Sequence, residues 1–250
     1  MNIIYLDHNK PVLLRKTVAC IGGFDGFHKG HQALLNRVLE ISEEKQCRSA
    51  VITFDIPPTA IFRKNTDRYT MNRHLMTLDQ KLEYLQSTGI DYACVLRFSL
   101  EMVEMKPEEF VDYLNSLNIV NLVIGFDFTY GYMGIGNFNS LMKSQKRKFD
   151  VELIEAVNDG GEKISTRRIV SLISNGDIYE ANRLLGHNYI IDGYVRGDHF
   201  ISKDNIIPKN GVFNVKINGK TRIIGIKYGY IMLRDESSQT TRIEFINEIR

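Results

Sequence analysis

The sequence Val-Ala-Cys-Ile-Gly-Gly-Phe-Asp-Gly-Phe-His-Lys-Gly-His, residues 18–31, decides the fold. Its four apolar residues predict a short buried strand that ends at Gly22 and Gly23. From His31 to Lys45, apolar residues recur at helical spacing and predict a helix with one apolar face. Where a strand ends and a helix begins, free backbone N–H groups and the helix dipole both favour a bound phosphate. This stretch therefore predicts an α/β fold with a phosphate site in its first loop.

Strand-like and helix-like segments continue to alternate after this loop. Helices are expected after Thr77, which has the spacing of a capping box with Gln80, after Pro107, and in a basic stretch before residue 151. Further strands are expected at 51–54, 92–96, 120–124 and 151–157. The alternation predicts a mostly parallel sheet with helices on both faces, whose ligands bind beyond the carboxyl ends of the strands. Three loops, 22–31, 55–62 and 125–131, are therefore expected to meet at one edge.

The character of the sequence changes after Gly186. Short, often alternating segments at 189–195, 212–217, 222–227, 230–234 and 241–246 are separated by Gly, Asn or Asp turns. Such a series predicts a small antiparallel sheet or barrel. We place the domain boundary near residue 187, which gives a first domain over 1–186 and a small C-terminal β domain over 187–250.

The composition restricts the class of protein. With 32 basic and 30 acidic residues the formal net charge is +2, which argues against binding nucleic acid through bulk charge. No apolar stretch approaches the roughly 20 residues that span a bilayer, and the first residues are too polar for a secretory signal. Cys20, Cys47 and Cys94 lie far apart and fit no zinc pattern. We therefore expect a cytoplasmic protein with reduced cysteines and no nucleic-acid or membrane partner; the sequence does not indicate its oligomeric state.

Two histidines make the first loop more specific than its glycines do. His28 and His31 flank Gly30, and residues three apart at a helix start can face the same side. Two imidazoles placed there can donate hydrogen bonds to phosphate oxygens that gain charge during transfer. Ordinary solvation of loop and cap residues is the structural alternative, and metal binding is another. No Cys, His or acidic partner at usable spacing supports a dedicated zinc site, so the pair favours phosphate chemistry.

Several segments in sequence order carry a family resemblance. Gly23–His31 resembles the G-x-F-D-G-x-H-x-G-H segment of the prokaryotic FAD synthetases, and the H-x-G-H element also marks the wider nucleotidyltransferase superfamily. Residues 53–58 resemble the family's T-F-[DE]-P-H-P segment with two positions altered, and 78–81 resemble its L-x-x-K helix start. Residues 125–131 resemble its G-x-D-F-x-F-G loop, and 164–166 open a segment similar to I-S-S-T-x-I-R. The resemblance covers about residues 15–200.

The resemblance implies a Rossmann-like domain that joins the AMP part of ATP to FMN, with Mg²⁺, and releases FAD and pyrophosphate. Asp25 would shape the turn or reach the metal, although Mg²⁺ is expected mainly on the ATP phosphates rather than in a protein metal site. For the aromatic residues, ordinary core packing is the alternative. The implied roles are catalytic for His28, His31 and Arg168; ATP-binding for Gly23, Phe24, Asp25, Gly30, Ser165, Thr166 and Arg167; and flavin-binding for Phe54, Pro58, Phe62, Asp127 and Phe128.

One departure from the family pattern affects the phosphate-binding wall. Arg167 occupies the position of the family's Thr, and Val170 occupies that of its final Arg. A cation is thus lost at 170 and gained at 167. Whether Arg167 or Arg168 contacts phosphate stays open at this point.

A second departure affects the C-terminal domain, which in this family is commonly a riboflavin kinase barrel. Residues 193–198 begin a pattern similar to its signature, but the G-R…P-T-A-N block does not follow before Pro208. We therefore predict a truncated, riboflavin-kinase-like barrel without kinase activity, and a monofunctional FAD synthase. Two alternatives are adenylyl or cytidylyl transfer to another phosphorylated acceptor and a flavin-binding regulator that has lost catalysis.

Overall fold

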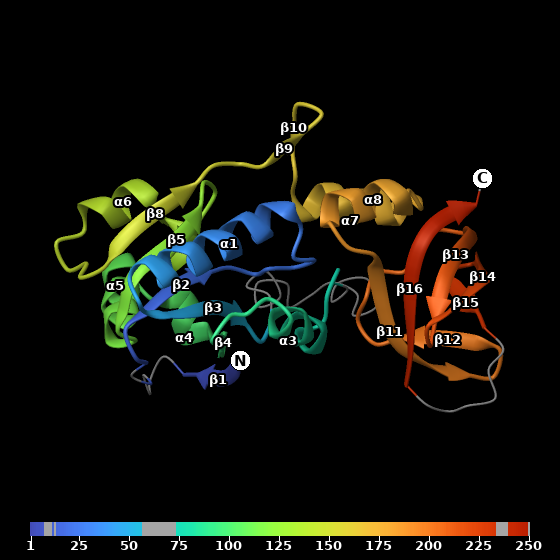
Figure 1. Cartoon of the computed structure of the whole chain (residues 1–250), viewed down its shortest axis with the longest axis horizontal. Helices are drawn as coiled ribbons and strands as arrows, with labels where there is room; N and C mark the ends of the chain where they lie inside the picture. The colour runs from blue at the N-terminus through green and yellow to red at the C-terminus, as the bar shows by residue number, and fades with distance from the viewer. Residues whose placement is uncertain (8–11, 13, 57–73, 234–239, 250) are drawn as a thin grey trace. The chain divides into compact units, whose positions relative to one another are not determined.

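The computed structural model describes residues 1–7, 12, 14–56, 74–233 and 240–249 (Figure 1). Internal contacts divide the chain into two compact units, and the chain passes between them inside the first loop. Unit 1 consists of Met1–Phe24, His31–Thr66 and Leu82–Val157, and unit 2 of Asp25–Gly30, Asp67–Lys81 and Asn158–Arg250.

Unit 1 is built on a six-stranded parallel sheet, which confirms the predicted fold class. Every residue of its central strand β2 is buried, as expected where both faces of a parallel sheet are covered. Cys20 and Cys94, in β2 and β4, are both buried free cysteines. In spatial order the strands are β1 (Asn2–Leu6), β4 (Tyr92–Leu96), β3 (Arg48–Phe54), β2 (Thr17–Ile21), β5 (Ile119–Gly125) and β8 (Asp150–Ile154).

The helices of unit 1 follow the apolar periodicity of the sequence. In α1 (Lys29–Glu44) the buried side chains include Leu34, Val38 and Ile41, spaced along one face. Pro107 occupies the first turn of its helix, as predicted. The remaining elements are α3 (Leu78–Gln86), which crosses from unit 2 into unit 1, α4 (Leu100–Glu104), α5 (Pro107–Ser116), α6 (Phe138–Lys143), the 3-10 turn η1 (Tyr132–Gly134), and the short strands β6 (Thr129–Tyr130) and β7 (Gly136–Asn137).

Two of the elements predicted in unit 1 differ from the structure. A helix was expected in the basic stretch before residue 151. Helix α6 instead ends at Lys143, and residues 144–149 are not helical. Strand β8 ends at Ile154 rather than at residue 157, and the next residues lead to a separate hairpin. Neither difference changes the order of the parallel sheet.

The order of strands places a topological switch point beside β2. The chain runs from β2 to its neighbour β3 on one side, and later returns to β5 on the other side. The loops that leave β2 and β5 therefore diverge at the carboxyl ends of adjacent strands. In open α/β sheets ligands bind at this point.

Unit 2 contains a closed antiparallel barrel, which confirms the predicted class of the C-terminal part. Closure leaves no unpaired strand edge. Its strands, in order around the barrel, are β11 (Tyr189–Arg196), β12 (His199–Ser202), β15 (Tyr230–Met232), β14 (Lys220–Lys227), β13 (Gly211–Ile217) and β16 (Thr240–Ile249). The hairpin β9 (Asn158–Asp159) and β10 (Glu162–Lys163) and the helices α7 (Thr166–Asn175) and α8 (Ile178–Leu185) precede it. Within the described ranges, no helix is long and apolar enough to cross a bilayer.

Candidate active site

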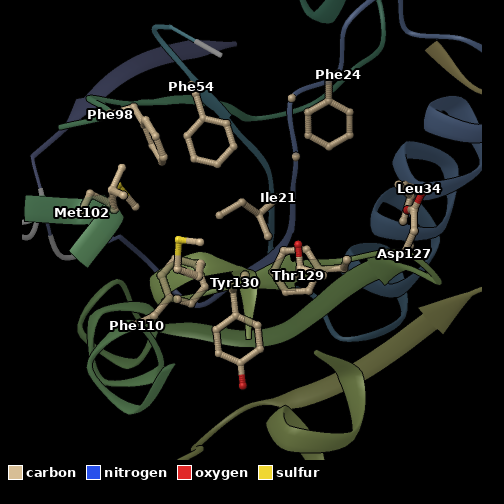
Figure 2. Close-up of a pocket in the computed structure, with 18 of the residues that line it drawn as sticks. Ile21, Phe24, Leu34, Phe54, Phe98, Met102, Phe110, Asp127, Thr129 and Tyr130 are labelled. Atoms are coloured by element: carbon tan, nitrogen blue, oxygen red, sulfur yellow. The ribbon is translucent and has the colours of Figure 1, made fainter. Parts of the chain in front are cut away.

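A cavity of about 570 Å³ lies in unit 1 at the switch point of the sheet (Figure 2). Gly23 and Phe24 follow β2, Phe54 ends β3, and Asp127 and Phe128 follow β5. The structure thus brings to one cavity two residues predicted for ATP and three predicted for the flavin. Its volume is within the range of small-molecule sites, which are mostly apolar with a few polar groups.

Aromatic side chains form much of the cavity wall. Phe54 and Phe98 meet edge to face, with ring centroids 5.3 Å apart, and Phe128 stacks on Tyr130 at 5.7 Å. The ring centroid of Phe110, from α5, lies 5.3 Å from that of Tyr130. Figure 2 shows the side chains around the cavity, with Phe54, Phe98, Phe110, Tyr130 and Met102 labelled. A flat apolar ligand ring would find aromatic contacts here, with a carboxylate at Asp127 for a polar edge.

His31 also lines this cavity, beside the first loop. Its ring meets that of Phe24 edge to face, with centroids 5.3 Å apart. Phe24 is buried and has a φ of 45°, a left-handed conformation that costs free energy for any residue with a Cβ. Strained backbone of this kind is concentrated at functional sites. Phe24 and His31 thus belong to a constrained part of the cavity wall.

The middle of the same loop belongs to unit 2. The Asp25 carboxylate accepts the N–H of Met76 at 2.9 Å, and the Asp25 carbonyl accepts the hydroxyl of Thr166 at 3.2 Å. His28 is buried, and a Cβ on Gly30 would lie 3.1 Å from its ring. Of the two roles expected for Asp25, the geometry supports shaping the turn.

Ser165 and Arg168 lie at the start of α7 in unit 2. Ser165 caps the helix by accepting the Arg168 N–H at 3.3 Å. The Arg168 guanidinium donates to the backbone carbonyls of Asp159 and Glu162, at 3.1 and 3.3 Å. Arg183 binds the Asp159 carboxylate through both oxygens, at 2.5 and 2.7 Å. Arg183 and, more weakly, Arg168 therefore hold the pKa of Asp159 below its usual range.

The predicted residues are thus divided between the two units. Arg167 is exposed on α7. Pro58 and Phe62 lie outside the described residues. Gly23, Phe24, His31, Phe54, Asp127 and Phe128 belong to unit 1, and Asp25, His28, Gly30, Ser165, Thr166, Arg167 and Arg168 belong to unit 2.

Comparison with known proteins assigns the chain to a family. The model of the FAD synthetase family matches residues 10–168, which is more than half of the chain. The chain belongs to the FAD synthetase family. It is therefore an enzyme of the nucleotidyltransferase class, and the matched region contains the first loop, Phe54 at the end of β3, the cavity loop after β5, and the start of α7.

Relatives of this FAD synthetase family member match along most of its length. A bifunctional riboflavin kinase/FMN adenylyltransferase of Listeria monocytogenes is 32% identical over 269 residues, covering 99% of this chain and 84% of the relative. An FAD synthetase of the same organism is 29% identical over 226 residues, covering 86% of this chain and 89% of that protein. A crystal structure described as a macrolide-efflux protein from Streptococcus pneumoniae has a TM-score of 0.87 at 22% identity, covering 100% of this chain and 91% of the other. At that identity the last likeness shows the fold alone.

Some cavity residues were not identified as site residues from the sequence of this family member. Phe98, Met102 and Met133 belong to no sequence motif, and Phe110 lies within the helix expected after Pro107. Tyr130 stood inside the loop motif at 125–131, which was the one available signal. Each of the others reaches the cavity through tertiary packing, which periodicity along the chain does not indicate.

Proposed function

We propose that this enzyme transfers AMP from ATP to FMN and releases FAD and pyrophosphate. The observation that carries the proposal is the cavity of unit 1, where Gly23 and His31 of the first loop line the same space as Phe54, Asp127 and Phe128. The family and the names of its relatives support the same reaction. The aromatic walls suit the isoalloxazine ring, and the loop suits phosphates.

The proposed chemistry needs positioning and charge stabilisation more than a protein nucleophile. A phosphate oxygen of FMN attacks the α-phosphorus of ATP, a P–O bond forms, and the bond to the leaving pyrophosphate breaks. His28 and His31 would donate hydrogen bonds to oxygens that gain charge in this step. Arg168, with Ser165, Thr166 and Arg167, would hold the phosphates of ATP. Phe54, Asp127 and Phe128, together with Pro58 and Phe62, would hold the flavin.

Mg²⁺ would be held mainly by the phosphates of ATP. Among the described side chains, no three or more His, Cys, Asp or Glu residues gather as a metal site, and the Asp25 carboxylate already accepts a backbone N–H. Phosphate oxygens are ordinary Mg²⁺ ligands, and few protein carboxylates are needed beside them. When bound, the ion would neutralise phosphate charge.

The proposal assigns AMP transfer to residues 1–186 and makes the enzyme monofunctional. Residues 187–250 would form a riboflavin-kinase-like barrel that has lost the kinase. Within the described barrel only eight residues, 203–210, connect β12 to β13. The buried free thiols of Cys20 and Cys94 support a reducing, cytoplasmic setting.

The reaction is tested with the purified chain, ATP, Mg²⁺ and FMN, by following FAD on a column and pyrophosphate by a coupled assay. His28→Ala and His31→Ala should each lower kcat by about 10²-fold or more if the imidazoles stabilise the transition state. His199→Ala is the matched control, because that histidine is exposed on the barrel strand β12. Turnover unchanged in all three variants would contradict the assigned role.

The same assay separates the alternatives. FMN binding without pyrophosphate release would indicate a flavin-binding protein without catalysis. Pyrophosphate released with another phosphorylated acceptor, or from CTP, but not with FMN and ATP, would indicate a different nucleotidyl transfer. If the chain forms no FAD and does not bind FMN, the proposed function is overturned.

A further inference from the structure

The first loop, residues 22–31, carries His28 and His31, to which we assign catalysis, and is called the catalytic loop below. Part of it is held by residues that lie outside the parallel sheet. Gly26 lies in this loop, and its carbonyl is 3.0 Å from Nε2 of His187, which follows the C-cap Gly186 of α8 and lies just before the barrel. The Asp25 carboxylate accepts the N–H of Met76, as described above. Residues 25–30 thus owe part of their conformation to hydrogen bonds with other residues of unit 2, among them those of His187 and Met76 beside that of Thr166.

The segment that carries Met76 is itself fixed to the barrel. The His74 N–H donates to the carbonyl of Asp204 at 2.8 Å, and the His74 carbonyl accepts the N–H of Ile206 at 3.1 Å. Asn205 stands between these two residues and is fully buried. Residues 74–76 therefore lie along the connection that follows β12.

Asn205 links the segment that carries Met76 to the barrel through both polar atoms of its side-chain amide. Its Nδ2 donates to the carbonyl of Leu75 at 3.2 Å and to Oε1 of Gln80 at 2.8 Å. Its Oδ1 accepts the N–H of Asp192, in β11, at 3.1 Å. A buried amide with three satisfied hydrogen bonds fixes geometry, since removing it takes one hydrogen bond from each of its three partners.

Resting on the proposed function, we propose that the barrel positions the catalytic loop, with Asn205 and His187 as positioning residues for AMP transfer. Asn205 acts through Leu75 and Met76 on Asp25, and His187 acts directly on Gly26. Neither residue needs to contact a substrate. The barrel thereby has a role in catalysis that does not depend on kinase chemistry.

The first test compares Asn205→Ala with Asn214→Ala. Asn214 lies in β13 of the same barrel and donates to Asn247 Oδ1 at 3.2 Å, so it matches the residue type and kind of contact. Misplacement of a catalytic loop by about 1 Å can cost on the order of 10²-fold in rate. We expect Asn205→Ala to lower kcat by about 10- to 10²-fold and Asn214→Ala to leave it within about twofold.

A binding measurement distinguishes positioning from general damage. The cavity proposed for the flavin is lined by residues of unit 1, so the FMN dissociation constant of Asn205→Ala, from quenching of flavin fluorescence, should stay within about twofold of wild type. A loss of FMN affinity equal to the loss of kcat would overturn the proposal, as would equal kcat losses in Asn205→Ala and Asn214→Ala.

His187→Ala gives a second variant in case Asn205→Ala does not fold. His187 is half-buried at the surface of unit 2, so its truncation leaves no large cavity. It should lower kcat about tenfold, and His187→Gln, which keeps an N–H donor for the Gly26 carbonyl, should recover part of the loss. Full activity in His187→Ala would contradict direct positioning of the loop.

Hydrogen exchange tests the proposal independently of the reaction. Asn205→Ala and His187→Ala should speed amide exchange in peptides covering residues 24–31, whereas Asn214→Ala should not. Unchanged exchange in the loop overturns the positioning role, even if the wild-type chain makes FAD. Faster exchange in a chain that makes no FAD would instead overturn the proposed function while retaining the structural link.

Discussion

Gly26 meets two constraints that no other residue type meets at its position in the first loop. Its φ is +87°, which L side chains rarely adopt. A Cβ added there would lie 2.7 Å from Cδ1 of Leu75 and 3.1 Å from Cδ2 of Leu185, and both leucines are buried. The glycine therefore allows the turn and also lets the loop lie close to the residues that position it.

Gly26→Ala should separate these two constraints when compared with Gly89→Ala. Gly89 has a φ of +85°, but a Cβ there would meet nothing within 4 Å. Both changes incur the backbone penalty, about 1 kcal/mol, and Gly26→Ala adds overpacking of about 1–3 kcal/mol. Urea unfolding measures the difference, and only Gly26→Ala should also lower kcat. Equal destabilisation by the two substitutions would show that the close approach to Leu75 is unimportant.

At the scale of the element, the β9–β10 hairpin is tied to α7 and α8 through one carboxylate. Arg183, with Arg168, lowers the pKa of Asp159, so folding favours its ionised form. The stabilisation is present above the pKa of an unfolded aspartate, about 3.9, and is lost as the pH falls through the lower pKa of the folded state. The pair of arginines thus makes this hairpin sensitive to acid.

Asp159→Asn should lower the urea midpoint at pH 7, and its difference from wild type should narrow as the pH falls from about 4 through the lower pKa of the folded state, because Asp159 then becomes protonated and uncharged in the folded wild type as well. The pH dependence of the midpoint, measured from pH 2 to 7, tests this. Glu162→Gln is the control, because that carboxylate is exposed and pairs with Arg168 only at 3.4 Å. A gap between Asp159→Asn and wild type that persists at low pH would contradict the electrostatic account.

Local patterns predicted some elements well and others not at all. The capping box of α3 is confirmed, since the Thr77 N–H donates to Gln80 Oε1 at 2.9 Å and the Gln80 N–H to Thr77 Oγ1 at 3.3 Å. Strand β1 was not predicted, because it is an edge strand whose Ile3 and Tyr5 are exposed. An edge strand with exposed side chains shows little apolar periodicity, so the sequence does not indicate it. A capping box, by contrast, is a contact between residues three apart and can be recognised from their spacing.

At the scale of the whole molecule, the sequence pattern did not predict contacts between residues that are far apart in the chain. Gln80 Oε1 was predicted as a cap, but it also accepts Asn205 Nδ2 at 2.8 Å, from a residue 125 positions away. The resemblance to the FAD synthetases implied the cavity residues Phe54, Asp127 and Phe128, and in the structure each of them follows or ends a strand whose carboxyl end faces the switch point. Phe98 reached the same cavity without any such signal.

The barrel raises the last question at this scale, because it closes without the block that the kinase needs. Pairing of β11 with β16, from Tyr189 opposite Phe245 to Tyr194 opposite Thr240, completes the ring of strands. The fold of the barrel therefore depends on its strands and buried core and not on the absent block. We propose that kinase activity is lost with that block, to which the family resemblance assigns the ATP contacts and metal ligands.

We expect the purified chain to form no FMN from riboflavin, ATP and Mg²⁺, and to form FAD only when FMN is supplied. A bifunctional riboflavin kinase/FMN adenylyltransferase, run in parallel, shows that the assay detects both steps. Because the proposed site binds a flavin that already carries its phosphate, riboflavin should not be converted at either unit. Accumulation of FMN or FAD from riboflavin alone would mean that the barrel has rebuilt a kinase site from other residues, and the enzyme would then be bifunctional.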